Sequence, residues 1–363
     1  MDGERVVVSE WGETPMEALE QFMRLEPQPQ PDAVGPSEVL LRVRSCAVGW
    51  VDLIMSSGQY QHMAKPPYTP GLEFAGDVVA VGSQVTQVKV GDRVLADGFK
   101  TGPRSSGAHQ AWGGFATWAL LPEEAAMLLP ASLSYDGAVN LLGNYETAHH
   151  VLVHRGRLCE GESVLILGAS GSTGLAGVHV AKLLGATVIA AGRNPGKLAQ
   201  VQQQGADHVL VTGDGEGGVR RFKDEVKALT GGRGVDLVWD GVGGPISVEA
   251  LRCLRFGGRF CIVGWAATPF VARGKGQRGA PNANVLPTNL MQIKGLDVLG
   301  CPAVIATKHD PTLRPRRLAW LWEQVEAGHI QPHVGEAYPL ASFDQALRAK
   351  WRSQFVGGCV LHP

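Results

Sequence analysis

The chain has 363 residues, of which 44% are hydrophobic and 18% are charged, and its formal net charge is −1. This composition is typical of a globular protein with room for two domains, and the balanced charge gives no reason to expect a nucleic-acid or membrane partner. The sequence begins with charged residues rather than a secretory signal and has no apolar stretch long enough to span a bilayer, so we expect a cytoplasmic protein. The six cysteines are scattered without a C-x-x-C pair, which argues against a structural zinc lobe and against a disulfide framework.

Short strands and turns dominate the first third of the sequence. Three apolar segments bounded by glycine, proline or aspartate predict strands at residues 38–44, 76–82 and 92–96. Their spacing predicts a compact, barrel-like domain. Residues 138–153 then have helical character.

A polar, glycine-rich segment at residues 98–114 interrupts this pattern. Loops of this length are usually functional or disordered, and both interpretations stay open. Its charged and aromatic residues are Lys100, Arg104, His109 and Trp112.

A glycine-rich turn is the most informative feature of the chain. The apolar strand predicted at 163–167 runs into Gly168-Ala169-Ser170-Gly171-Ser172-Thr173-Gly174, after which apolar residues recur at helical spacing and a second strand follows at 186–191. This strand–turn–helix unit opens a dinucleotide-binding fold, since the glycines admit a pyrophosphate and the helix N-terminus attracts its charge. Only Gly171 and Gly174 match the G-x-G-x-x-G pattern, with Ala169 at its first position, so a plain tight turn is the alternative.

The end of the second strand indicates which dinucleotide is bound. Sites for NAD place an Asp or Glu there to bind the ribose hydroxyls, whereas this chain reads Gly192-Arg193-Asn194-Pro195-Gly196-Lys197. Arg193 and Lys197 suit a 2′-phosphate, which favours NADPH. Two solvated charges at a helix start are the alternative interpretation.

Strands and helices alternate through the rest of the chain, which predicts a parallel sheet. Further strands are expected at 208–211, 235–240, 258–264 and 296–300, a helix at 313–327 and a final strand at 355–361. A second polar loop, residues 268–284, contains Arg273, Lys275 and Arg278.

Several motifs resemble those of the medium-chain dehydrogenase/reductase superfamily, in its zinc-free NADPH:quinone oxidoreductase-like branch. They are PYTPGLEFAGDV at 67–78, VGDRV at 90–94, GAD at 205–207, DGVGG at 240–244 and LPTNL at 286–290 with Lys294. The resemblance covers nearly the whole chain and implies an α/β protein: a GroES-like β-barrel catalytic domain (1–134 and 306–363) interrupted by a Rossmann domain with a doubly wound parallel sheet (135–305). It also implies a homodimer.

The resemblance, together with the glycine turn and the two cations, identifies the residues expected at the site. The NADPH-binding residues are Thr147, Ser170, Gly171, Ser172, Thr173, Gly174, Arg193, Lys197, Val242, Val263, Gly264 and Asn289. Tyr60 and Tyr145 are the candidate hydrogen-bond or proton donors to an acceptor carbonyl, with a packing role for Tyr60 as the alternative.

Zinc-dependent members of the superfamily have Cys, His and Cys ligands where this chain has Gly49, Leu72 and approximately Asn144. Leu72 cannot bind zinc, so we expect no metal. Where quinone oxidoreductases often have Asn, Tyr and Lys, the chain has Gly49-Trp50, Thr212 and Gly358.

The expected activity is hydride transfer from NADPH to a small-molecule quinone or other conjugated carbonyl compound, such as an enone or enal. An enoyl thioester reductase, favoured by the cations of the 268–284 loop, and a catalytically weak NADPH-binding sensor or structural protein remain alternatives.

Overall fold

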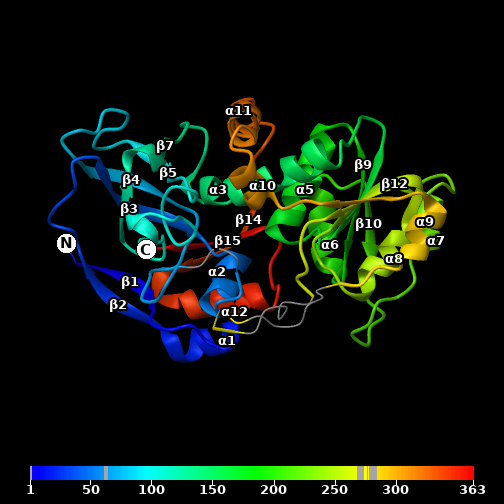
Figure 1. Cartoon of the computed structure of the whole chain (residues 1–363), viewed down its shortest axis with the longest axis horizontal. Coiled ribbons are helices and arrows are strands. Elements are labelled where there is room, and N and C mark those ends of the chain that lie inside the picture. Colours follow the sequence, from blue (N-terminus) through cyan, green and yellow to red (C-terminus); the bar gives the residue numbers. More distant parts are fainter. Residues whose placement is uncertain (1, 61–63, 268–273, 276, 278–283) are drawn as a thin grey trace. The chain divides into compact units, whose positions relative to one another are not determined.

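The computed structural model describes residues 2–60, 64–267, 274, 275, 277 and 284–363, and the chain divides into two compact units (Figure 1). Unit 1 consists of Met1–Leu142, Phe270–Ala280 and Pro332–Pro363, and unit 2 of Gly143–Pro269 and Pro281–Gln331. The expected domains divided at 134/135 and 305/306 instead. Residues 306–331 stay with unit 2 because helix α11 (Leu313–Glu326) is held there by ion pairs of Arg314 and Arg317 with the buried Glu146, at 3.0 and 2.5 Å.

Unit 1 is organised around β3 (Glu38–Ala47), which is mostly buried because both of its faces are covered. It pairs antiparallel with β4 (Phe74–Val81), β6 (Trp118–Pro122) and β15 (Gly358–His362). The same sheet contains β5 (Arg93–Ala96), β7 (Ala126–Leu128) and β14 (Val334–Pro339), and a separate hairpin joins β1 (Asp2–Val8) to β2 (Met23–Pro29). The helices are α1 (Pro15–Glu17), α2 (Trp50–Ser56), α3 (Tyr135–Val139) and α12 (Phe343–Trp351). The strands predicted at 38–44, 76–82, 92–96 and 355–361 are confirmed.

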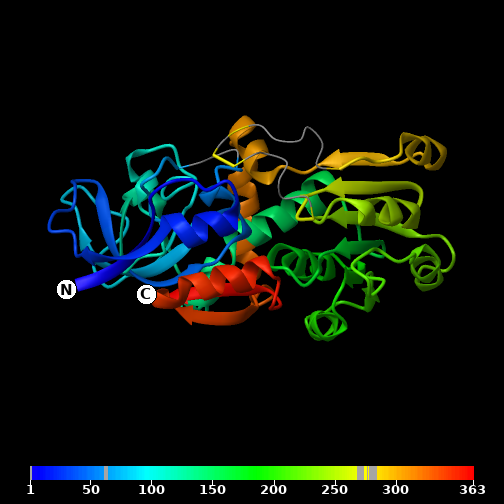
Figure 2. The same cartoon turned by 90° about the horizontal axis from the view of Figure 1, so that it is seen from below.

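Unit 2 contains a parallel sheet of six strands in the order β10-β9-β8-β11-β12-β13, so the doubly wound prediction is confirmed. The strands are β8 (Ser163–Leu167), β9 (Thr187–Gly192), β10 (His208–Val211), β11 (Val235–Asp240), β12 (Leu254–Ile262) and β13 (Asp297–Gly300). Figure 2 shows β13, in orange, at one edge of this sheet.

Helices cover both faces of the sheet of unit 2. Helices α7 (Lys223–Leu229), α8 (Pro245–Cys253) and α9 (Thr288–Lys294) pack on one face against alternate strand residues such as Leu165 and Val238. Helix α5 (Ser172–Leu183) lies on the other face, where Gly177 faces the ring of the buried Trp239. The unit also contains α6 (Pro195–Gln203) and α10 (Ala303–His309). Within the described residues, every helix is too short or too polar to cross a bilayer.

The helix predicted at 138–153 is present but irregular. It starts as α3, which ends at Asn140, and it continues through π-helical turns on either side of α4 (Thr147–His149). The side chain of Asn140 donates to the carbonyl of Asp136 at 2.9 Å and so competes with regular helical hydrogen bonds.

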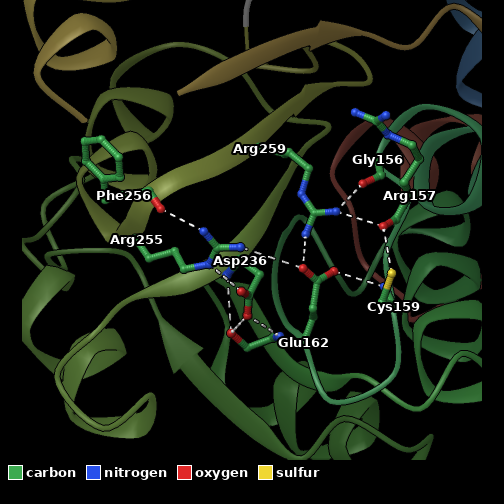
Figure 3. A network of polar contacts seen from close by, with 9 residues as sticks. Gly156, Arg157, Cys159, Glu162, Asp236, Arg255, Phe256 and Arg259 are labelled. Carbon is green, nitrogen blue, oxygen red and sulfur yellow. Dashed lines mark hydrogen bonds and ion pairs between the residues drawn. The ribbon is translucent and has the colours of Figure 1, made fainter. Parts of the chain in front are cut away.

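A network of ion pairs joins the amino ends of three strands of unit 2 (Figure 3). Arg259 of β12 contacts Glu162, which precedes β8, at 2.5 Å, and donates to the carbonyls of Gly156 and Arg157. Arg255 contacts Asp236 of β11 at 2.5 Å. These groups fix one end of the sheet, and the opposite, carboxyl end is where ligands bind in sheets of this topology.

Candidate functional site

The glycine turn lies at the carboxyl end of β8 and is tightly closed. Gly168 has φ +71°, a left-handed conformation that favours glycine, and its carbonyl accepts from the N–H of Gly171 at 3.0 Å. A Cβ atom at Gly174 would lie 2.3 Å from the carbonyl oxygen of Gly168, so only glycine fits there. Because Gly168 takes the left-handed turn position, the buried Ala169 is compatible with the motif.

The turn leaves a helix N-terminus open to a ligand. Gly171 is exposed, and Ser170, Ser172 and Thr173 are partly exposed. Helix α5 begins at Ser172, so the positive end of its backbone dipole lies at the glycine turn. Such a terminus favours an anionic group, so its geometry is compatible with the expected pyrophosphate site.

The loop after β11 lies against this turn. Asp240 is fully buried, and its carboxylate accepts from the N–H groups of Val242 and Gly243 at 3.0 and 2.9 Å. Burial raises the pKa of Asp240, and these hydrogen bonds oppose the increase. The side chain of Val242 approaches the turn so closely that a Cβ at Gly168 would be 3.1 Å from its Cγ2.

The segment after β12 reaches the same edge. The N–H groups of Val263 and Gly264 both donate to the carbonyl of Asp240, at 2.8 and 3.2 Å. The structure thus brings Val242, Val263 and Gly264 together with the glycine turn, as a dinucleotide site requires.

Two cations follow β9. Arg193 is exposed, and within the described residues it forms no ion pair. The side chain of Asn194 caps α6 by accepting from the N–H of Lys197 at 3.0 Å, which fixes Lys197 beside Arg193. Burial, and then the charge of Arg193, lower the pKa of Lys197. Two like charges held together in this way form a site suited to an anion.

The residues predicted near the nicotinamide differ in their environments. Thr173 donates to the side-chain oxygen of Asn144 at 2.8 Å, and Thr147 donates to the carbonyl of Gly143 at 2.7 Å. The hydroxyl of Tyr145 is 2.7 Å from Nδ1 of His179, and burial raises the pKa of Tyr145. The Tyr145 hydroxyl is therefore engaged inside unit 2.

Asn289 is exposed at the start of α9, and its side chain forms no hydrogen bond within the described residues. At the other end of α9, Lys294 donates to the carbonyl of Arg252 at 2.9 Å. Asn284 was not predicted as a site residue, but it donates to Ser247 at 2.8 Å, and Ser247 in turn donates to Asp240 in the loop beside the glycine turn.

Unit 1 contains a second polar cluster around the buried Asp52 of α2. Its carboxylate accepts from the N–H groups of Gly49 and Gly71, at 2.9 and 3.0 Å, and from that of Leu72. Burial raises the pKa of Asp52 to about 6, although these hydrogen bonds and the charge of Arg104 oppose the increase. Gly49 and Leu72, at the positions of zinc ligands, thus surround a carboxylate.

Tyr60 belongs to the same cluster. It is partly buried against the core of unit 1, and the guanidinium of Arg104 hydrogen-bonds to its hydroxyl. Burial raises the pKa of Tyr60, and the charge and hydrogen bond of Arg104 partly offset that increase.

Sequence reasoning missed Asp52 and the role of Arg104, because loops distant in the chain build their surroundings. The only available signal was a polar residue in an otherwise apolar helix and a cation in a glycine-rich loop. Across the described residues, no group of three or more His, Cys, Asp or Glu side chains is arranged to hold a metal ion.

Family models of known proteins match a segment in each of the two units. Residues 35–131 match the family model described as the alcohol dehydrogenase GroES-like domain, and residues 172–301 match the model described as zinc-binding dehydrogenase. The chain is 33% identical to bovine (Bos taurus) quinone oxidoreductase-like protein 2 over 319 residues, which covers 87% of this chain and 82% of the relative. It is 31% identical to rat (Rattus norvegicus) quinone oxidoreductase over 322 residues, with 87% of each chain covered.

A solved structure is similar over the same extent. A mycobacterial protein, described as complexed with NADPH, matches with a TM-score of 0.76 and 26% sequence identity. The match covers 99% of this chain and 100% of the mycobacterial chain.

Proposed function

Because the chain belongs to the medium-chain dehydrogenase/reductase superfamily, in its quinone oxidoreductase-like branch, we propose that it transfers hydride from NADPH to a conjugated carbonyl compound without zinc. The acceptor is a quinone or an α,β-unsaturated ketone or aldehyde. The reduced nicotinamide supplies the hydride, and the protein positions the cofactor and the acceptor.

The observation that carries the proposal is the Arg193–Lys197 pair. Arg193 stands where an NAD site has an acid, and the capped start of α6 holds Lys197 beside it. The 2′-phosphate of NADPH would relieve the repulsion between the two cations. The glycine cradle, Val242 and Gly264 would hold the rest of the dinucleotide, and the mycobacterial neighbour was solved with NADPH.

A titration of both cofactors tests this assignment. Charge-assisted contacts to a phosphate contribute about 1.5–3 kcal/mol each, so Arg193→Ala should weaken NADPH binding roughly tenfold or more and leave NADH binding nearly unchanged. Arg233→Ala, which changes an exposed arginine elsewhere in unit 2, is the matched control. Equal losses for NADPH and NADH in Arg193→Ala would contradict the assignment.

The surroundings of Asp52 support a zinc-free reaction. A simple alcohol needs help to lose its proton as hydride leaves, which zinc supplies in zinc-dependent enzymes, whereas a conjugated acceptor delocalises the incoming charge and needs only hydrogen-bond donors. Leu72 offers no ligand atom. Of the two candidate donors we place Tyr60 at the acceptor, because it lies beside Arg104, whereas the hydroxyl of Tyr145 contacts His179 inside unit 2.

The enoyl thioester alternative rested on the cations of the second polar loop. Arg273 and Arg278 lie outside the described residues. Lys275 lies 3.6 Å from the carboxylate of Glu13, so its charge already has a partner. The described residues therefore add no support for the thioester alternative, and the conjugated carbonyl compound stays the proposed acceptor.

A homodimer is part of the proposal. Strand β13 lies at the edge of the sheet of unit 2, and Val298 on it is 37% exposed. An exposed strand edge is commonly covered by a partner, and pairing with its twin would extend the sheet across a two-fold axis.

A further inference from the structure

The segment at 98–114 is a closed, hydrogen-bonded loop in this structure. The N–H of Thr101 donates to the carbonyl of Asp97 at 3.1 Å, and the N–H of Gly102 donates to the carbonyl of His109 at 3.2 Å. His109 anchors the loop to β3 through Glu38, at 2.8 Å. Residues 101–105 are buried, so the side chains of this part of the loop are held in place by packing.

Arg104 is the residue that this loop fixes. It is only 8% exposed, and its guanidinium carbon lies 5.0 Å from the centre of the Phe99 ring. Its buried Nε atom has no hydrogen-bond partner, and no carboxylate in the described part of the chain lies within 4.0 Å of it. Buried charges are normally paired, because a buried charge without a partner is strongly destabilising. A buried guanidinium with an unused donor therefore indicates a ligand.

The guanidinium lies beside the positions that bind metal in the zinc-dependent branch. A Cβ atom at Gly98 would lie 3.0 Å from Nη2 of Arg104 and 2.7 Å from the carbonyl oxygen of Leu72. Leu72 in turn donates its N–H to Asp52. Arg104 thus brings a fixed positive charge next to Leu72, which takes the place of a zinc-binding histidine.

We propose that Arg104 and Tyr60 together bind the carbonyl oxygen of the acceptor, with Arg104 supplying positive charge where other members use a metal ion. This inference rests on the proposed function. Arginine has only N–H donors, so the Tyr60 oxygen accepts in their contact and the phenol keeps its proton for transfer.

The proposed reaction needs only NADPH, the acceptor and water. Hydride adds to the β-carbon of the acceptor, the carbon–carbon double bond shifts, and the electron pair reaches the carbonyl oxygen as an enolate. The Tyr60 hydroxyl donates its proton to that oxygen, and Arg104 stabilises first the enolate and then the phenolate. Water returns a proton to Tyr60, and the released enol tautomerises to the saturated ketone. A quinone gives the hydroquinone by the same two transfers.

Binding of 4-nitrophenolate, an anionic probe that needs no turnover, tests the site directly in the full-length protein with NADP⁺ present. The wild-type protein should bind the phenolate form, which is visible by its absorbance. Arg104→Met should weaken binding about tenfold or more, and Arg104→Lys should fall between the two, because lysine keeps the charge without the fork geometry. Lys100→Met, which removes an exposed cation of the same loop, should bind like the wild type.

Equal phenolate binding by the wild type and Arg104→Met would overturn the proposal. If Arg104→Met fails to fold, judged by circular dichroism, Arg104→Lys and Tyr60→Phe carry the test, since both should weaken the probe by fivefold or more. Acceptor turnover should fall in Arg104→Lys and Tyr60→Phe with the NADPH dissociation constant unchanged. If the wild type reduces no acceptor at all, the proposed function fails, whereas the phenolate titration still decides the Arg104 site by itself.

Discussion

At the scale of single residues, the groups of the two candidate sites differ in how far along the chain their partners lie. The glycine turn and Arg193 lie within thirty residues of each other, so local pattern identifies them. Asp52 and Arg104 gain their properties from groups distant in the chain, since Gly71 and Leu72 contact Asp52 and Tyr60 contacts Arg104. Burial and these contacts are properties of the folded chain, and no spacing rule reveals them.

Two glycines of the turn give a prediction with an internal control. In Gly174→Ala the new Cβ would lie 2.3 Å from the Gly168 carbonyl oxygen, so the backbone must shift, at a cost of about 1–3 kcal/mol. In Gly171→Ala the Cβ would lie 3.5 Å from the same oxygen, an ordinary contact, and φ is −75°. Denaturation should show a loss of stability for Gly174→Ala only. NADPH titration should show weaker binding for both, because the proposed site places Gly171 against the cofactor. Equal stability of the two variants would contradict this account of the turn.

At the scale of secondary-structure elements, the sequence predicts buried strands best. The strands expected at 163–167, 208–211 and 235–240 have those bounds in the structure. A short apolar run flanked by turn residues is typical of a buried strand, so its ends are marked in the sequence. The edge and hairpin strands β1, β2, β6, β7 and β14 were not predicted. Strands β1, β2 and β14 mix polar and apolar side chains, β6 and β7 are only five and three residues long, and the pairing of all five depends on partners elsewhere in the chain.

The ion-pair network at the amino ends of the strands should affect stability without affecting cofactor binding. Arg259→Met removes two hydrogen bonds to carbonyls and leaves Glu162 without its closest cation. We expect a loss of about 1.5–3 kcal/mol in the free energy of unfolding, measured by urea denaturation. Arg221→Met, an exposed arginine, is the control and should change it little. A weaker affinity for NADPH in Arg259→Met, with unchanged stability, would contradict this separation of the two ends of the sheet.

Two histidines of the helical segment 147–155 should make the protein sensitive to acid. The pKa values of His149 and His150 are lowered to about 4, first by burial and then by the charge of Arg317. The folded protein keeps both histidines neutral down to about pH 4, whereas in the unfolded chain they take up protons near the ordinary histidine pKa of about 6.5. The free energy of unfolding therefore decreases as pH falls from about 6.5 towards 4. The loss should be on the order of 2 kcal/mol or more.

Variants at single histidines check this pH dependence. Unfolding measured at pH 7 and at pH 5 should show a smaller difference in His150→Gln than in the wild type. His309→Gln, an exposed histidine, should keep the wild-type difference. An unchanged difference in His150→Gln would show that the acid sensitivity has another source.

At the scale of the whole molecule, the family resemblance predicted the two-part architecture, whereas the boundaries depended on packing. The long-range pairing of Glu146 with Arg314 and Arg317 keeps α11 in unit 2, and no local signal marks that contact. The sequence likewise did not assign Lys275 to unit 1, where its N–H donates to the carbonyl of Ser57 at 2.8 Å.

The expected dimer can be tested at the edge of the sheet. Light scattering at micromolar concentration should give about twice the chain mass of 38.6 kDa. Val298→Lys places a charge on the exposed edge strand and should shift the protein towards the monomer, because charged edges oppose strand pairing. A wild-type protein that is entirely monomeric under these conditions would refute the proposed pairing of β13.

The most direct test of the central claim is cofactor oxidation with a panel of acceptors. Quinones, enones, enoyl thioesters and primary alcohols, the last with NADP⁺, are compared side by side by absorbance at the nicotinamide wavelength, with and without a zinc chelator. The account predicts NADPH oxidation by quinones or enones, faster than with NADH, and unchanged by the chelator. Turnover of alcohols alone, activity lost with the chelator, or no oxidation above background would contradict it.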